Sequence, residues 1–315
     1  MFNSLCNLNK LSLTTLCFYR LLLYVLKLMT TKYRVESIIG VDGERIVVVL
    51  EDGFPMWYPN LYYSTTRRAN GYAHNTCLLE ARNISKLHAW LAGNGIDLEQ
   101  RFLQGDYLQL AEIDSLVDSI RRRCLKKPAA CKTVKFQTQR RTLQQSPYIS
   151  AKSANTAIHQ IANYMDWWID VSNGRVGENQ RRAREVEIRR MLQALRKQAP
   201  RPDRADISRY IKALPDEVID QIFTLIDPES DSNPWMHEGV RIRNYLAISM
   251  LYNLGIRKGE LLGLKGTDLN LPDSCLQIRK TPDDPEDPRL QEPNAKTRAR
   301  ELMISGKISQ WINLY

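Results

Sequence analysis

One short segment of the chain has the residue types and the spacing to bind a phosphate group. Residues 254–264 read LGIRKGELLGL, which places Arg257 between a predicted helix and the start of the next one. The helix dipole disfavours a cation at a helix start, so another interaction must favour arginine there. Glu260 is close enough to hold its side chain, and a fixed guanidinium can bind a phosphate through two hydrogen bonds. From spacing alone, a purely structural pair between Arg257 and Glu260 is an equally good interpretation.

The positive charge of the chain is concentrated in a second segment. The 315 residues include 45 Lys and Arg but 35 Asp and Glu, and this net charge of +10 indicates a polyanionic partner, with nucleic acid first and an anionic membrane second. Residues 119–165 contain neither Asp nor Glu, so phosphates would neutralise their charge and release counter-ions. A solvated basic loop is the alternative. The residues proposed to contact phosphate are Arg121, Arg122, Arg123, Lys126, Lys127, Arg140 and Arg141.

Two further features of the helical region have competing interpretations. Residues 179–204 are rich in arginine, but pairs such as Glu185 with Arg189 have the spacing of ion pairs on one helix. A solvated helix face is therefore as good an interpretation as a DNA-binding face. Trp168 lies at helical spacing from Ile161 and Met165, which predicts a core residue rather than one that stacks on bases.

Helices and short strands must position these segments, and the patterning predicts a mainly α fold with small β elements. A strand at residues 45–50, between turns at 42–43 and 52–53, predicts a small β element over residues 33–60. Apolar spacing predicts helices over 75–93, 113–120, 153–173 and 179–198, which together form a helical domain over residues 61–200. Ser153 is the expected N-cap of the third helix.

Residues 201–315 form the last predicted domain, after Pro200 and Pro202. Helices are expected over 215–226, 240–254 and 258–264, and the second is apolar nearly all round, so we expect it to be buried. Strands at 275–279 and 300–304 flank a proline-rich acidic loop, residues 282–293, which lacks calcium-loop spacing. We expect this loop to point away from DNA phosphate or to pair with Arg289.

The remaining features limit the class and location of the protein. Six cysteines without a C-x-x-C pair and four histidines distant from them argue against a zinc site or a disulfide framework, so we expect a cytoplasmic protein without a metal. Residues 11–29 are apolar, but Arg20 in their middle disfavours a membrane span. The apolar extension over residues 1–32 has three interpretations: untranslated sequence before a start at Met29, a packed or disordered extension, or a membrane anchor.

The segment around Arg257 resembles the first conserved box of the tyrosine recombinases, the phage integrase family. Gly266 is one departure from the family, because many members have Trp at this position. The resemblance implies that Arg257 holds the scissile phosphate. It also implies a helical core-binding domain followed by a partial α+β catalytic domain that needs no cofactor and self-associates on DNA. The family pattern is Gly-x-Arg-x-x-Glu-Leu-x-x-Leu followed by Asp, and it is matched by Gly255, Arg257, Glu260, Leu261, Leu264 and Asp268.

Residues 295–302, AKTRAREL, resemble the hairpin that carries the catalytic lysine in the same family. The resemblance makes Lys296 the acid that would protonate the leaving 5′ oxygen. General acid catalysis needs a lysine whose pKa is lowered by neighbouring charges, and Arg298 and Arg300 are cations of the right sign. Lys280, at the end of the preceding predicted strand, is the competing assignment.

The later motifs of the family do not follow Lys296 in this sequence: a His-x-x-Arg box, a further His or Trp, and the tyrosine nucleophile. Tyr315 follows Arg257 too closely to be that tyrosine, and we expect it to be a half-buried aromatic. The chain is thus expected to be a truncated, inactive form of an enzyme for site-specific DNA recombination. A non-catalytic DNA-binding protein and a membrane-tethered basic regulator are the alternatives.

Overall fold

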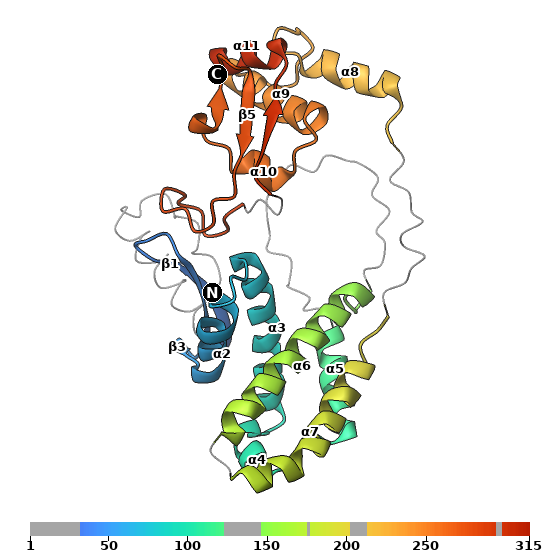
Figure 1. Cartoon of the computed structure of the whole chain (residues 1–315). Helices are drawn as coiled ribbons and strands as arrows, with labels where there is room; N and C mark the ends of the chain where they lie inside the picture. Colours follow the sequence, from blue (N-terminus) through green and yellow to red (C-terminus); the bar gives the residue numbers. More distant parts are fainter. Residues whose placement is uncertain (1–31, 123–145, 175–176, 202–212, 294–297) are drawn as a thin grey trace, which may run out of the picture. The chain divides into compact units, whose positions relative to one another are not determined.

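A computed structural model of the chain describes residues 32–122, 146–174, 177–201, 213–293 and 298–315. Over these residues the protein is mainly helical, with two small three-stranded antiparallel sheets (Figure 1). It divides into two compact units. The first contains the described parts of Met1–Ile38, Ile46–Tyr72 and Thr76–Asp203; the second contains those of Ile39–Arg45, Ala73–Asn75 and Arg204–Tyr315.

The first sheet has the strand order β1-β2-β3, with β1 (Tyr33–Ile39), β2 (Arg45–Glu51) and β3 (Phe54–Pro55). Val47 and Val49 alternate into the core, as expected for a strand with one buried face. The predicted β element extends too far, because residues 57–60 are helical: α2 (Trp57–Tyr62) and the π-helix η1 (Tyr63–Arg68) follow the sheet. These helices escaped prediction because each spans less than two turns and shows no clear apolar period.

Five longer helices follow, and they share one core with the inner face of the first sheet. Trp168 is buried in this core, as predicted. The third predicted helix begins earlier than expected, because Ser150 rather than Ser153 is the N-cap: its hydroxyl accepts a hydrogen bond from the Ser153 backbone N–H. The sequence did not indicate α4. The helices are α3 (His74–Gly93), α4 (Leu98–Gln104), α5 (Leu110–Arg121), α6 (Ala151–Asn173) and α7 (Glu178–Lys197).

The second unit combines helices with the sheet β4-β5-β6, in which both strand pairs are antiparallel. Ile278 of β5 lies opposite Arg300 of β6. The core lies between α9, β5 and α11, with Leu246, Leu276 and Ile308 among its buried residues. The elements are α8 (Asp216–Ile226), α9 (Glu238–Asn253), α10 (Lys258–Leu262), η3 (Gly266–Asp268), β4 (Leu269–Asn270), β5 (Cys275–Ile278), β6 (Arg300–Met303) and α11 (Gly306–Leu314).

Two burial predictions for this unit are wrong. α9 buries one face rather than its whole surface, because the core of the unit lies along the side that carries Ile242, Leu246 and Met250, and Leu251 and Tyr252 are exposed. Tyr315 is 69% exposed, since it follows the last turn of α11 and its side chain does not reach the core. No helix among the described residues is both long enough and apolar enough to cross a lipid bilayer.

Candidate phosphate-binding site

Arg257 lies in the connection between α9 and α10, and local sequence explains this geometry. Gly255 has a positive φ of 61°, which glycine adopts without strain, and it ends the α9 segment as predicted. Arg257 is the N-cap residue of α10, and its backbone N–H donates to Glu260 Oε2 at 2.9 Å. Its Nη1 lies 3.6 Å from Glu260 Oε1, and its side chain is 61% exposed. The guanidinium is therefore held from one side and open to solvent on the other.

Glu260 is the centre of this arrangement, and its main side-chain partner is Arg300. Arg300 donates from Nη1 to Oε1 at 3.1 Å and from Nη2 to Oε2 at 2.8 Å, which is a bidentate pair. The carboxylate of Glu260 is fully buried, whereas the Arg300 side chain is partly exposed. Hydrogen bonding to Glu260 raises the pKa of Arg300, so this guanidinium stays charged. The sequence placed Arg300 in a strand but gave no signal for this contact.

A second buried carboxylate, Asp268, repeats the pattern. Its Oδ2 accepts from the backbone N–H of Lys265 at 2.9 Å, at the start of η3. Its Oδ1 lies 3.3 Å from Nε of Arg279, the residue after β5. Arg279 also donates to Gln277, and its side chain is half exposed. Two guanidinium groups at the same end of the β5–β6 pair are thus each held by a buried acid.

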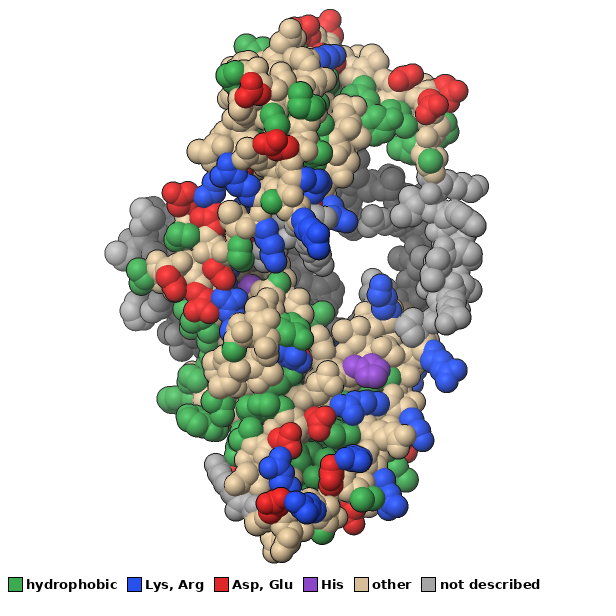
Figure 2. Space-filling view, in the orientation of Figure 1, with side chains coloured by type: hydrophobic (Ala, Val, Ile, Leu, Met, Phe, Trp, Pro, Cys, Tyr) green, Lys and Arg blue, Asp and Glu red, His purple; other side chains and the backbone are tan. Residues whose placement is uncertain are grey.

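Positive side chains collect around this end of the second unit. Lys280 follows Arg279 at the end of β5, and Arg298 precedes β6; both are exposed. Figure 2 shows Lys and Arg side chains gathered around α10 and the adjacent ends of β5 and β6. Lys296 lies outside the described residues, so its assignment against Lys280 stays a prediction.

The acidic loop between β5 and β6 is partly neutralised by cations of the same unit. Lys265 Nζ lies 2.7 Å from a carboxylate oxygen of both Asp284 and Glu286. Asp287 forms the predicted contact with Arg289, at 2.7 Å. The hydrogen bond from Lys265 lowers the pKa of Asp284, so this acid is ionised in its ion pair. Asp284, Glu286 and Asp287 therefore each have a cation beside them.

Arg45, the first residue of β2, also belongs to this unit. Its sequence context indicates a strand but no contact of its side chain. Its side chain is fully buried, and its donors meet the loop backbone: Nε reaches the Arg289 carbonyl at 3.2 Å and Nη2 the Asp287 carbonyl at 2.7 Å. Nη1 donates to the carbonyls of Gly43 at 2.9 Å and Asp284 at 3.3 Å. Arg45 thus fixes the backbone of the acidic loop.

The basic segment of the first unit is described only at its two ends. Arg122 and Tyr148 form an isolated antiparallel bridge, and the Ile149 backbone N–H donates to the Arg121 carbonyl at 2.9 Å. The Arg121 guanidinium lies over the Tyr148 ring, 5.6 Å from its centre. Arg122 pairs with Asp118 at 2.6 Å. The other predicted phosphate contacts, Arg123, Lys126, Lys127, Arg140 and Arg141, lie outside the described residues.

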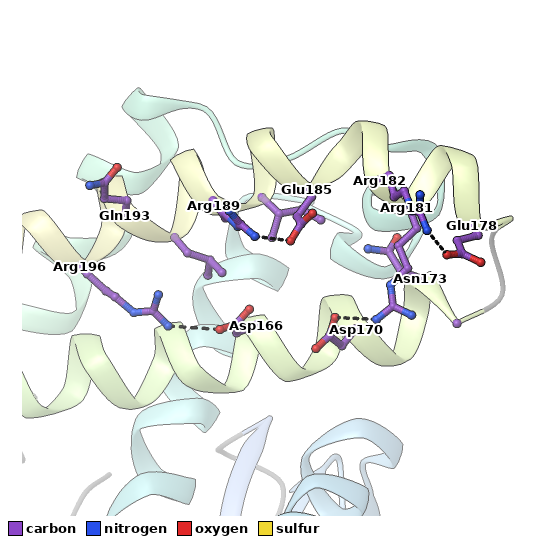
Figure 3. Close-up of a pocket in the computed structure, with 13 residues that line it drawn as sticks. Asp166, Asp170, Asn173, Glu178, Arg181, Arg182, Glu185, Arg189, Gln193 and Arg196 are labelled. Carbon is purple, nitrogen blue, oxygen red and sulfur yellow. Dashed lines mark hydrogen bonds and ion pairs between the residues drawn. The ribbon is translucent and has the colours of Figure 1, made fainter.

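Four arginines of α7 face acids, which favours the solvated-face interpretation for this part of the helix. A groove of about 870 Å³ follows α7 and the adjacent part of α6 (Figure 3). In it, Arg182 pairs with Glu178 at 2.6 Å, Arg181 with Asp170 at 3.3 Å, and Arg196 with Asp166 at 3.4 Å. The predicted pair between Glu185 and Arg189 is also present. Because each cation has an acid beside it, this groove has little net charge to attract phosphate.

Neither a metal cluster nor a known relative adds to this description. Among the described residues, no group of three or more His, Cys, Asp or Glu side chains is placed to hold a metal ion. A scan of protein-family models and searches of the curated proteins and of the solved structures found no match to this chain.

Proposed function

We propose that this protein binds double-stranded DNA through its phosphates, and that Arg257 holds one phosphodiester in the manner of a tyrosine recombinase. The observation that carries the proposal is the exposed guanidinium of Arg257, which stands beside Arg300 on the buried carboxylate of Glu260. A guanidinium that is held on one side can offer its remaining N–H groups as a planar fork to a phosphate.

Three further observations favour phosphate over other anions. The site is open and bounded by several exposed cations, which suits a ligand that continues beyond one charged group. Lys265 and Arg289 lie beside three acids of the neighbouring loop and so reduce its repulsion of a polyanion. The net charge of +10 adds long-range attraction to DNA.

The first unit would supply most of the affinity. The bridge between Arg122 and Tyr148 brings the two described ends of the basic segment together. Phosphate contacts of this kind add affinity without reading sequence. The arginines of the α7 groove would contribute less, because the groove is lined by as many acids as arginines.

The salt dependence of DNA binding tests this division. With six or more phosphate contacts, log affinity for duplex DNA should fall with log salt at a slope steeper than about −5. The combined change Arg121→Ala, Arg122→Ala and Arg123→Ala should flatten the slope by up to about 3. The matched control removes three cations of the α7 groove, Arg181→Ala, Arg182→Ala and Arg189→Ala, and should change the slope by less than about 1. Equal effects of the two triple variants would contradict the proposed interface.

A further inference from the structure

We propose that Arg300 is a positioning residue for Arg257 and acts through the carboxylate of Glu260. The proposal rests on the proposed function only in assigning a phosphate to Arg257; the positioning itself follows from contacts within the second unit. Arg300 would fix Glu260, and Glu260 would fix the orientation of Arg257.

The two arginines share the same two oxygen atoms. Oε2 of Glu260 accepts from the Arg257 backbone N–H and from Arg300 Nη2, at 2.9 and 2.8 Å. Oε1 accepts from Arg300 Nη1 at 3.1 Å and lies 3.6 Å from Arg257 Nη1. Because both oxygens bond to one planar guanidinium, the carboxylate cannot rotate without breaking a bond to Arg300. Its orientation in turn sets the direction from which Arg257 is attracted.

Arg300 is suited to this task because its backbone is fixed by the sheet. It pairs with Ile278, which is buried in the core of the unit. Arg257 lies in a connection between helices and has a largely exposed side chain, so it would otherwise sample many rotamers. The buried carboxylate also has no access to water that could replace a lost hydrogen bond. The sheet would thus fix Arg300, and Arg300 would orient Arg257 through Glu260.

Arg279 provides a matched control. It lies at the same end of the β5–β6 pair, carries the same charge and is held by a buried acid, but that acid is Asp268 rather than Glu260. Arg279→Gln and Arg300→Gln therefore remove the same charge from the same region, and Arg300 alone of the two contacts the acid that holds Arg257.

The first measurement needs no ligand. In the full chain labelled with ¹⁵N-arginine, the heteronuclear NOE of the Arg257 Nε–H group reports the order of its side chain. Arg300→Gln should lower this NOE to the value of a freely moving side chain, and Arg279→Gln should leave it unchanged. Arg300→Lys keeps the charge but loses the fork, so it should restore little of the order. An unchanged NOE in Arg300→Gln would overturn the proposal.

The second measurement connects order to binding, with inorganic phosphate as the probe. Phosphate should shift the Arg257 Nε–H resonance of the wild type, and Arg300→Gln should weaken its apparent affinity about tenfold. Arg279→Gln should weaken it less than about threefold, through charge alone. Equal weakening by both variants would contradict positioning. If phosphate does not shift the Arg257 Nε–H resonance of the wild type, the proposed function of Arg257 is refuted. The NOE measurement would still decide the positioning proposal.

A separate measurement shows whether the second unit of Arg300→Gln is still folded. Backbone amide resonances of Leu276 and Ile278 report whether the core of the second unit is intact. If Arg300→Gln disrupts them, Arg300→Lys tests the same contact, because lysine keeps a counter-charge for the buried carboxylate of Glu260 but cannot form the bidentate pair. It should lower the Arg257 NOE while the amide resonances of the core persist, and an unchanged NOE there would also overturn the proposal.

Discussion

Glu260 and Asp268 are matched carboxylates: each accepts a hydrogen bond from the backbone N–H three residues before it and holds an arginine at one end of the β5–β6 pair. Both are buried, and each joins the start of a short helix to an arginine at one end of the second sheet. The result is that two short helices and two guanidinium groups keep fixed positions at the end of the unit where positive charge collects.

The buried charge of Glu260 should contribute strongly to stability. Glu260→Gln leaves Arg300 and Arg257 without their counter-ion, so we expect the free energy of unfolding of the second unit to fall by about 2 to 4 kcal/mol. Denaturant unfolding would measure this. Glu301→Gln is the control, because Glu301 is exposed on β6 and contacts Gln277; it should cost less than about 0.5 kcal/mol. Similar costs for both variants would rule out a special role for the buried acid.

Arg45 should determine the order of the acidic loop. Arg45→Met removes the donors that satisfy the carbonyls of Gly43, Asp284, Asp287 and Arg289. We therefore expect the free energy of unfolding of the second unit to fall by roughly 3 to 5 kcal/mol. Limited proteolysis should then cut within residues 282–293 more rapidly than in the wild type. Arg45→Lys should be intermediate, since it keeps the charge with fewer donors. Wild-type resistance of Arg45→Met to proteolysis would show that the loop is ordered by other contacts.

Stability of the first unit should depend on pH through His88. Burial lowers the pKa of His88 to about 4, and its Nε2 lies 3.1 Å from the Tyr164 hydroxyl. The unfolded chain binds a proton at His88 near pH 6.5, whereas the folded chain does not until about pH 4, so stability falls as pH decreases through this window. We expect a loss of about 2 kcal/mol between about pH 7.5 and pH 5. Replacement by a residue that does not titrate, His88→Phe, should remove this part of the pH dependence, and an unchanged dependence would contradict the assignment.

Arg257 should matter little for overall DNA affinity. It would contact one phosphate among many, so Arg257→Ala should weaken binding of duplex DNA less than about threefold. Fluorescence anisotropy at fixed salt measures this, with the triple change at Arg121, Arg122 and Arg123 as the strongly weakened reference. If Arg257→Ala weakened binding as much as that triple change, Arg257 would be a principal anchor rather than a local clamp.

Local patterns were sufficient to locate most of the secondary structure. Helices α3, α5, α7 and α8 and strands β2, β5 and β6 lie where apolar spacing predicts them, because burial of one face imposes a period on nearby residues. The stop at Gly255 and the closeness of Glu260 to Arg257 are also local, since a helix cap joins residues three positions apart. The short helices α2 and α4 carried too few residues to show a period.

The partners of the charged residues depend on the tertiary structure. Arg300 and Glu260 are 40 positions apart, and Arg45 and Asp283 are separated by 238, so no local spacing could indicate either contact. Whether a charged side chain is buried with a partner or solvated is decided when distant segments pack, because only then is water removed from it. The sequence by itself therefore determined which residues could hold a phosphate and roughly where the helices lie. Packing decided which acids hold Arg279 and Arg300 and which buried groups Arg45 contacts.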